Sequence, residues 1–455
     1  MRPEHERRPS ATPPGAERPR SVPTRGPELP ARRRVAVPPS APGGPRLDRP
    51  RSGRSRRRQK RGPKRGPNRA PKRRHPVRRA VLLVLVVALV PVGWSYGRAL
   101  TAPGSASLAA RSVEWLSAHG GQRFVLWAER TWYSHHAPPV GGTPQGGIPS
   151  AAPQGKQPAA RSTIAHLPAP QDFTPLAKHP LPREGTWQPI GQSVDGVPTM
   201  YEAFLRPDQV HTSLLAGVVW MDTSVLNAEL VAGTQVPPSG AWRPSAEVPR
   251  SQRNRLAAAF NSGFLLNDAR GGWYADGRTA QPLRTGAASL VINKDGSATV
   301  EAWNRDVSMS PQVAAVRQNL SLIVDGGRPV PGLGTTDFQR WGATLGNAVL
   351  VWRSGVGVTQ DGALIYAAGP GLSVQSLADI LARAGAVRAM ELDINTEWVT
   401  FNFYAPHPGL PYGEHTSKLL AGMVRPSTRY LVPDERDFFA MLAPSSPRPA
   451  GSSAP

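Results

Sequence analysis

The sequence predicts an α+β domain of mixed sheets and helices that follows a single N-terminal transmembrane helix. An uncharged apolar segment covers residues 80–97, and short apolar runs separated by turn residues recur between residues 185 and 435. An amphipathic helical pattern follows Ser373. Much of the remaining 455-residue chain is rich in proline, glycine or arginine, so we expect only about half of it to fold.

The apolar segment, AVLLVLVVALVPVGWSYG, has 18 residues without charge. A helix of that length measures roughly 27 Å, close to the thickness of the bilayer interior. Trp94 and Tyr96 suit the membrane interface, and the preceding positive charges favour a cytoplasmic N-terminus and an extracytoplasmic C-terminal domain. A buried core helix or a signal peptide cleaved near Ala99 and Ala102 are the alternatives, although the 79 residues ahead of the segment argue against cleavage.

Residues 1–79 form a basic tail that holds 26 lysines and arginines against 5 acidic residues. Its proline, arginine, glycine and serine composition favours disorder, because little apolar surface is available to bury. Such a tail beside a membrane helix suits anionic lipid headgroups, and a solvated spacer is the alternative. Nucleic acid could be held by the same charge, but specific recognition is not indicated.

The regions around the domain differ in composition. Residues 98–134 contain helical spacing interrupted by Gly120 and Gly121, which predicts short juxtamembrane helices. Residues 135–184 are rich in proline and glycine and predict a flexible linker that lifts the domain off the membrane, whereas residues 436–455 predict a C-terminal tail.

Within the domain, residues 288–303 and 355–369 each contain two β runs around an Asp-Gly turn, which predicts two hairpins. Ser373 suits the N-cap of a helix that Gly385 ends. A strand is expected at 387–393, and its alternation places Glu391 and Asp393 on one face.

Polar residues follow another apolar run in LAAAFNSGFLLND, residues 256–268. Asn261 and Gly263 stand where a buried strand would end at a cleft, although an asparagine in an ordinary turn is the alternative. Asp325-Gly326-Gly327 is more simply a hairpin turn than a phosphate loop.

Three segments in order, AFNSGF at 259–264, WRSGVGVTQDGALIYAA at 352–368 and LSVQSLADILARAGAVRAMELD at 372–393, resemble the phosphodiester glycosidase family. The resemblance extends over about residues 195–405. It implies hydrolysis of a sugar phosphodiester and a carbohydrate or sugar-phosphate substrate. The family includes an enzyme that uncovers mannose 6-phosphate by removing N-acetylglucosamine.

By position, Asn261 and Gly263 match the family's Asn-Gly-Gly-Phe-Phe motif, and Arg353 and Ser354 match the motif that opens with arginine. A guanidinium suits a phosphodiester because its fork binds two oxygens, although Arg353 could equally pair with a structural carboxylate. Asp393 matches the aspartate of the Asp-Gly-Gly-Gly-Ser motif, but residues 394–397 are Ile-Asn-Thr-Glu in place of the glycines and serine.

The resemblance and the residues lead to a set of site predictions. Asp393 is expected as the main catalytic carboxylate with Glu391 or Glu397 as its partner, since glycoside hydrolysis needs two carboxyl groups. Ordinary ion pairing is the alternative for both glutamates. Arg353 and Ser354 are expected to bind the anion, and Asn261 and Gly263 to position the substrate. No cofactor is identified and no metal site is predicted.

Other chemistry has no support in the sequence. The chain has no cysteine, which excludes disulfides and a cysteine nucleophile, and it contains no nucleophile-elbow, phosphate-loop or zinc-protease motif. The sequence therefore predicts a membrane-anchored extracytoplasmic hydrolase of a glycosidic or sugar-phosphodiester bond in the cell envelope. The alternative is a non-catalytic envelope protein that binds glycans or polyanions through the same fold.

Overall fold

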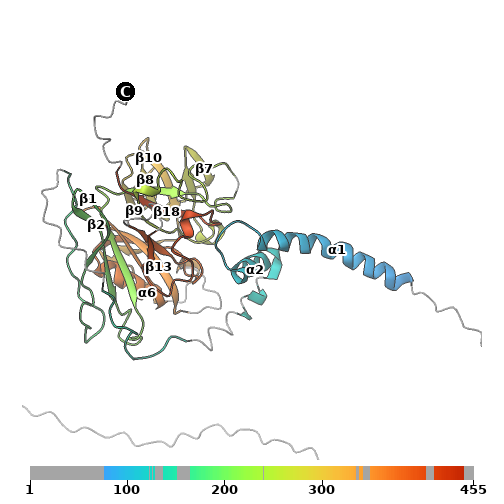
Figure 1. Cartoon of the computed structure of the whole chain (residues 1–455), viewed down its shortest axis with the longest axis horizontal. Helices are drawn as coiled ribbons and strands as arrows, with labels where there is room; N and C mark the ends of the chain where they lie inside the picture. The colour runs from blue at the N-terminus through green and yellow to red at the C-terminus, as the bar shows by residue number, and fades with distance from the viewer. Residues whose placement is uncertain are drawn as a thin grey trace, which may run out of the picture. The chain divides into compact units, whose positions relative to one another are not determined.

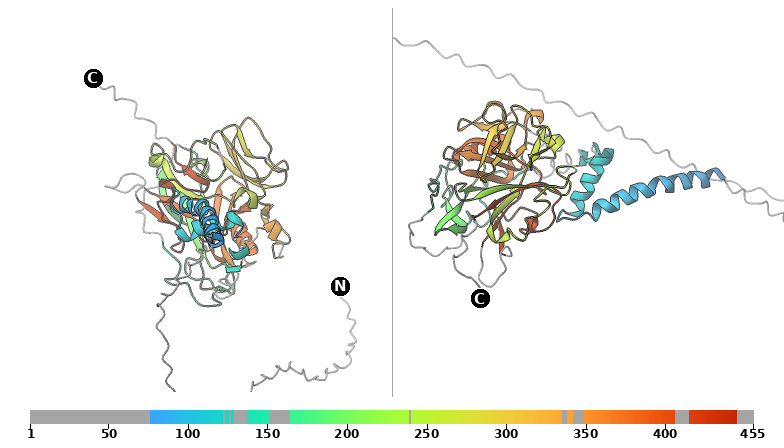
Figure 2. Two further views of the ribbon diagram at one scale, coloured as in Figure 1. Left: turned by 90° about the vertical axis from the view of Figure 1, so that its right-hand side faces the viewer. Right: turned by 90° about the horizontal axis from the view of Figure 1, so that it is seen from above.

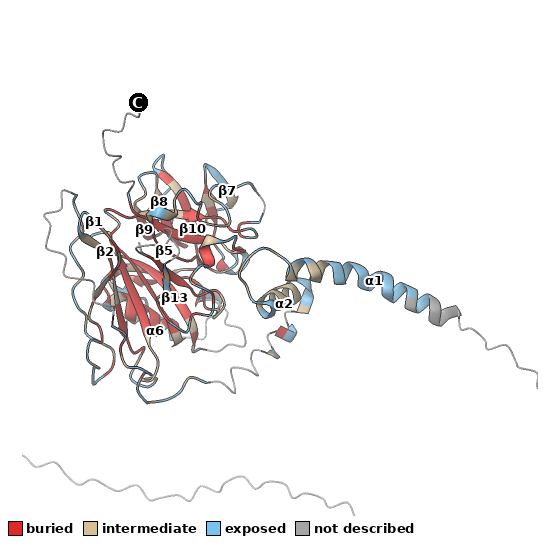
Figure 3. Cartoon of the chain, viewed as in Figure 1, coloured by how far each residue is buried: buried red, intermediate tan, exposed pale blue. Residues whose placement is uncertain are grey.

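The computed structural model describes residues 76–121, 123–125, 127–128, 137–150, 164–238, 240–334, 338–341, 349–405 and 415–444. The predicted basic tail, residues 1–79, falls almost entirely outside them. Helix α1 (Pro76–Leu100) contains the apolar segment and includes Pro91. Its window Leu83–Leu100 has a mean hydropathy of 1.7 and none of it is buried, so α1 is a candidate membrane span and not a core helix (Figure 3).

Two short elements follow α1. Helix α2 (Leu108–Leu116) begins at the N-cap Ser107 and continues into a π-helical turn at Ser117–Gly121. The described residues of 123–128 are also helical, where the spacing predicted juxtamembrane helices.

Eight strands form the largest sheet, in the order β1-β2-β3-β14-β13-β15-β11-β12, with antiparallel neighbours (Figure 1). We call it the large sheet. The bounds are β1 Gln188–Val194, β2 Val197–Leu205, β3 Ala216–Met221, β11 Leu322–Asp325, β12 Arg328–Pro329, β13 Val351–Thr359, β14 Leu364–Leu372 and β15 Ala386–Glu391.

Two five-stranded antiparallel sheets complete the domain. The β10 sheet has the order β7-β6-β10-β8-β9, and the β5 sheet has the order β17-β16-β5-β18-β4. Their bounds are β4 Asn227–Val231, β5 Leu256–Asn261, β6 Trp273–Ala275, β7 Arg278–Gln281, β8 Ala288–Asn293, β9 Ala298–Ala302, β10 Val313–Gln318, β16 Phe401–Tyr404, β17 Thr416–Lys418 and β18 Phe438–Leu442. Single helical turns occur at Arg253–Arg255, α4 Leu266–Ala269, α5 Phe338–Trp341 and Arg429–Leu431.

The core has two main layers, one on each face of the large sheet. On one face, helix α6 (Val374–Arg383) packs with apolar residues of β11, β14 and β15. On the other face, side chains of all three sheets share a second core, which includes Phe260, Phe401 and Phe439. Figure 2 shows the strands of the domain from two further sides. Where β5 ends, the Asn261 side chain bonds to Ser354 of β13, and β13 pairs with β15.

Several sequence predictions are confirmed here. The hairpins β8–β9 and β13–β14 and helix α6 occur where the patterns placed them. Strand β15 follows α6 as expected but ends at Glu391 instead of residue 393. The Asp325-Gly326-Gly327 segment is the turn between β11 and β12, with Gly326 and Gly327 at φ of 59° and 74°.

The proportion of strand to helix and two of the domain boundaries differ from the expectation. The described domain is predominantly β, with α6 as its one long helix, and its other helical elements are single turns. We placed residues 436–455 in a tail, but β18 lies between β4 and β5 in the middle of the β5 sheet. Residues 164–184, placed in a flexible linker, contribute Leu167, Phe173 and Leu176 to the α6 core.

The N-cap of α6 can be tested by Ser373→Ala. Ser373 Oγ accepts the Ser376 amide at 3.0 Å, and Ser376 Oγ accepts the Ser373 amide at 2.9 Å. Loss of the capping oxygen should lower the free energy of unfolding by about 1 kcal/mol, measured by denaturant unfolding of the purified chain. The exposed Ser251→Ala is the control and should cost less than about 0.5 kcal/mol. Equal midpoints for the two variants would contradict the role of the cap.

Candidate functional site

Asn261, the last residue of β5, joins the β5 sheet to the large sheet. Its Nδ2 donates to Ser354 Oγ at 3.0 Å, and its Oδ1 accepts from Tyr366 Oη at 2.9 Å and from the Thr400 amide at 3.0 Å. The side chain is buried, so each of these hydrogen bonds replaces one to water. Asn261 therefore fixes neighbouring groups instead of projecting into solvent.

Ser354, on β13, transmits this constraint to Asp393. Its Oγ donates to the Asp393 carbonyl at 3.0 Å, and its amide donates to the same carbonyl at 2.9 Å. The backbone is thus held in place immediately after β15 ends at Glu391. The structure therefore brings together Asn261, Ser354 and Asp393, three of the residues selected from the sequence.

Asp393 is only 4% exposed, and its carboxyl group accepts hydrogen bonds from the turn that follows β15. Its Oδ1 accepts the amides of Ile394 at 2.8 Å and Asn395 at 2.9 Å. Burial raises the pKa of Asp393, while the charge of Arg436, these two amides and the charge of Arg429 oppose the rise. A carboxyl group with a raised pKa stays protonated at pH values closer to neutral, so it can act as a proton donor there.

Arg353 and Glu391 form a separate buried ion pair. A Cβ on Gly355, two residues along β13 from Arg353, would approach Leu377 and Leu381, so this face of β13 points to α6. Arg353 there bonds to the Glu391 carboxylate, the Leu372 carbonyl and the Val349 carbonyl. The expected anion clamp is therefore occupied by protein groups in this structure.

The Glu391 carboxylate is fully buried, and its Oε2 has no hydrogen-bond partner. Burial raises the pKa of Glu391 to about 7, although Arg353 lowers it. We expected Glu391 and Asp393 on one face of a strand that continued to residue 393. Because β15 ends at Glu391, Asp393 belongs to a turn and takes its hydrogen bonds from that turn.

Gly263 permits a close approach between backbone and side chain. A Cβ there would lie 2.7 Å from Asn319 Cγ, and Asn319 itself donates to the Glu391 carbonyl at 2.7 Å. The neighbouring Ser262 donates to the buried Asp437, which also pairs with Arg317 at 2.7 Å. In this structure the Asn-Ser-Gly segment positions the ends of three sheets.

Glu397 faces the segment that leaves α1. Its Oε1 accepts the Ser107 amide at 2.8 Å and lies 3.8 Å from Arg425 Nη1. The side chain is 17% exposed, so it is the most accessible of the three predicted carboxyl groups.

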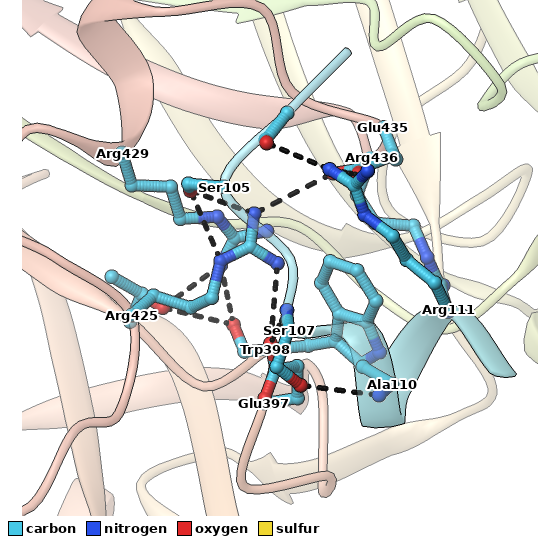
Figure 4. A network of polar contacts seen from close by, with 12 residues as sticks. Ser105, Ser107, Ala110, Arg111, Glu397, Trp398, Arg425, Arg429, Glu435 and Arg436 are labelled. Carbon is cyan, nitrogen blue, oxygen red and sulfur yellow. Dashed lines mark hydrogen bonds and ion pairs between the residues drawn. The ribbon is translucent and has the colours of Figure 1, made fainter. Parts of the chain in front are cut away.

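Three arginines that the sequence reasoning missed surround Trp398 (Figure 4). The guanidinium carbons of Arg425, Arg429 and Arg436 lie 4.9, 5.2 and 4.5 Å from the centroid of the indole ring. We call these three residues the arginine cluster. Its signal in the sequence is the run RPSTRYLVPDER, residues 425–436, where charge is unusually dense for a domain segment.

Acidic residues balance the arginine cluster. Asp434 bonds to Arg429 at 2.7 Å and Arg425 at 3.1 Å, and Glu435 lies 3.5 Å from Arg425. Burial raises the pKa of Asp434, but the two arginines outweigh it and leave the pKa below its usual value. Arg425 Nη1 is buried without a hydrogen-bond partner. The arginine cluster is therefore packed and charged, and one of its nitrogen donors makes no hydrogen bond.

The described part of the chain contains no group of three or more His, Cys, Asp or Glu residues arranged to hold a metal ion. The chemistry that the residues themselves offer is acid-base, from Asp393 and Glu397, beside positive charge from the arginine cluster.

One known protein family matches part of the chain. Residues 254–393 match the family model of the phosphodiester glycosidases, which confirms the resemblance over that part of the chain. The match begins just ahead of β5 and ends at Asp393. It covers less than half of the chain. No curated protein sequence matches.

The solved structures that match the chain share little sequence with it, and their TM-scores are low. One is the catalytic domain of zebrafish N-acetylglucosamine-1-phosphodiester alpha-N-acetylglucosaminidase, auto-inhibited by its pro-peptide, with 14% identity, a TM-score of 0.35, and coverage of 64% of this chain and 92% of that one. A hypothetical protein from Synechocystis has 12% identity, a TM-score of 0.32 and coverage of 56% and 64%. A putative exported protein from Burkholderia pseudomallei has 14% identity, a TM-score of 0.24 and coverage of 51% and 74%.

The buried ion pair can be tested by Arg353→Met. At pH 8, above the Glu391 pKa of about 7, loss of Arg353 should lower the free energy of unfolding by about 3 kcal/mol, because the buried Glu391 must then stay charged without a partner or take up a proton. At pH 5 the cost should be smaller, since protonated Glu391 needs no cation. Denaturant unfolding at both pH values gives the two costs.

The double variant Arg353→Met/Glu391→Met removes both charges and should recover much of the loss at pH 8. Arg328→Met, an exposed arginine of β12, is the control and should change stability by less than about 0.5 kcal/mol. A single variant no less stable than the double variant would contradict the ion-pair assignment.

Proposed function

We propose that this protein is a membrane-anchored, extracytoplasmic hydrolase that cleaves a glycosidic or sugar-phosphodiester bond in the cell envelope. The observation that carries the proposal is the position of Asp393. It is a buried carboxyl group with a raised pKa, fixed by Asn261 and Ser354 at the end of the segment that matches the phosphodiester glycosidases.

Asp393 is the proton donor in this proposal. Its proton passes to the oxygen that links the anomeric carbon to the leaving group, and the bond between that carbon and that oxygen breaks. The oxygen of a water molecule bonds to the anomeric carbon, and Glu397 accepts a proton from that water. The products are the free sugar and an alcohol or phosphate monoester, as acid-base hydrolysis by two carboxyl groups requires.

The arginine cluster supplies the positive charge that a phosphodiester needs. Arg436 and Arg429 act electrostatically on Asp393, so negative charge that develops nearby is stabilised by the same residues. Arg353 has no part in this step, because Glu391 already occupies it. The membrane anchor in the proposal is α1, which is long and apolar enough to span a bilayer.

A non-catalytic glycan-binding or polyanion-binding protein is the second candidate. The burial of Asp393 favours it, since a catalytic acid must reach its substrate and this residue is 4% exposed. The two candidates differ in one measurement, the release of product.

The first test compares the purified full chain with its Asp393→Asn variant on a panel of sugar-1-phosphodiesters and envelope glycans. Asparagine keeps the shape of the side chain but cannot donate the acid proton, so kcat/KM should fall by about 100-fold or more. Asp361→Asn, in the exposed β13–β14 turn, is the control and should leave kcat/KM unchanged. Glycan binding without product release from the unaltered chain would favour the second candidate.

The pH profile gives a second test. If Asp393 acts in its protonated form, kcat/KM falls as pH rises through its pKa. Arg436→Gln removes the largest opposing charge, so the pKa of Asp393 should rise and the alkaline limb should move to higher pH. The exposed Arg328→Gln should leave that limb in place. A limb that stays fixed, or moves to lower pH, in Arg436→Gln would exclude Asp393 as the acid that this limb reports.

A further inference from the structure

The chain docks on the domain almost as soon as it leaves α1. Ser105 Oγ accepts from Arg425 Nε at 3.1 Å and from Nη2 at 2.9 Å, and the Ser107 amide donates to Glu397 at 2.8 Å. Gly104 passes so close to Glu435 that a Cβ would lie 2.4 Å from its carboxylate oxygen. We call Thr101–Leu116 the juxtamembrane segment.

Helix α2 strengthens this contact with two ion pairs. Arg111 lies 3.3 Å from Glu435, and Glu114 bonds to Arg436 at 2.7 Å. Arg111 also donates to the carbonyls of Leu100 and Gly104, both at 2.7 Å, so a single side chain ties the end of α1 to the domain (Figure 4). Several of these groups are almost fully buried, where ion pairs are screened little by salt.

The other side of α2 is bonded to α1. Tyr96 Oη and Ser112 Oγ are 2.8 Å apart, and Trp115 Nε1 donates to Ser95 Oγ at 3.0 Å. The rings of Tyr96 and Trp115 are 4.9 Å apart. A continuous set of contacts therefore joins α1 and α2 to the face of the domain that carries Glu397 and the arginine cluster.

These contacts limit the distance from the membrane to the site. Six residues separate Leu100 from Ser107, and the seven residue-to-residue steps between them measure at most roughly 25 Å when extended. Ser107 bonds to Glu397, which is four residues beyond Asp393. Residues 135–184 cannot increase the distance, because the docking contact precedes them.

Exposed aromatic residues lie along the same part of the chain. Trp94, Phe124 and Trp127 are 72%, 60% and 61% exposed, which is unusual for such large apolar side chains. Aromatic side chains of this kind are favoured in the headgroup layer of a bilayer. Their placement on both sides of α2 indicates that the juxtamembrane segment lies at that layer.

From this geometry we infer that the substrate is itself anchored in the bilayer: a sugar joined through a phosphodiester to a lipid, or to a polymer attached to one. This inference rests on the proposed hydrolase function and adds the class of substrate. A site held within reach of the headgroup layer meets bilayer-anchored substrates at a high effective concentration and gains no such advantage with soluble ones.

The test uses the full chain in proteoliposomes and one sugar-1-phosphodiester presented in three forms. The first carries a long-chain lipid in the same bilayer, the second is linked to a lipid-anchored polymer, and the third carries a short water-soluble alkyl group. At equal total concentration we expect at least tenfold faster hydrolysis of an anchored form than of the soluble form. The faster of the two anchored forms identifies the lipid or the polymer as the source. Equal rates for all three would overturn the inference.

A variant shows whether the docking causes the preference. Arg111→Gln removes the bonds to Leu100, Gly104 and Glu435 but touches no residue assigned to the chemistry. It should reduce the preference for anchored substrate and leave hydrolysis of the soluble form unchanged. The exposed Arg123→Gln should keep the preference. An undiminished preference in Arg111→Gln would contradict the role of the juxtamembrane segment.

A labelling experiment decides the location independently of activity. The chain has no cysteine, so Thr396→Cys and Ala106→Cys each carry a single fluorophore. Energy transfer to acceptor-labelled headgroups should be similar from the two positions. Strong transfer from Ala106→Cys with none from Thr396→Cys would overturn the inference. Similar transfer without hydrolysis of any of the three forms would instead reject the proposed hydrolase, and with it the substrate class.

Discussion

The hydrogen bonds of the Asn261 carboxamide are the constraint on which the arrangement of the site depends. One amide group contacts the end of β5, the Tyr366 hydroxyl of β14, the Ser354 hydroxyl of β13 and the Thr400 amide ahead of β16. Each partner is buried, and an unsatisfied buried polar group costs about 1–3 kcal/mol. The two sheets are therefore fixed relative to each other where Asp393 begins its turn.

Buried charge is the second feature that shapes this domain. Arg317–Asp437, Arg353–Glu391 and Arg429–Asp434 are all nearly inaccessible to water, so their desolvation must be offset by close pairing. The three pairs differ in whether their arginine can influence Asp393. Arg353 and Arg317 are fully used by internal partners, whereas the arginine cluster stands next to Asp393 and influences its protonation. Positive charge at the site thus comes from the C-terminal segment and not from β13.

Local patterns in the sequence were sufficient to predict the two hairpins and α6. Asn261, Ser354 and Asp393 were selected through the resemblance to the phosphodiester glycosidases, and the structure brings these three residues together. They were insufficient for the direction of Arg353, because the register that pairs it with Glu391 is set by neighbouring strands. The juxtamembrane contacts join residues about 290 to 320 positions apart, and no local periodicity indicates such pairs. The membership of β18 in the β5 sheet was missed for the same reason.

The four residues that follow Asp393, Ile394-Asn395-Thr396-Glu397, are engaged in contacts within the protein. The amides of Ile394 and Asn395 donate to the carboxylate of Asp393, so they are not directed at a ligand. The carboxylate of Glu397 turns to Ser107 and Arg425, which partly neutralise the charge that would otherwise repel an anion. In the proposed function, the arginine cluster is therefore the source of positive charge for an anionic substrate. The juxtamembrane segment bonds to two of those arginines through Ser105 and Glu114, while Arg425 Nη1 keeps a donor that no hydrogen bond in the domain uses.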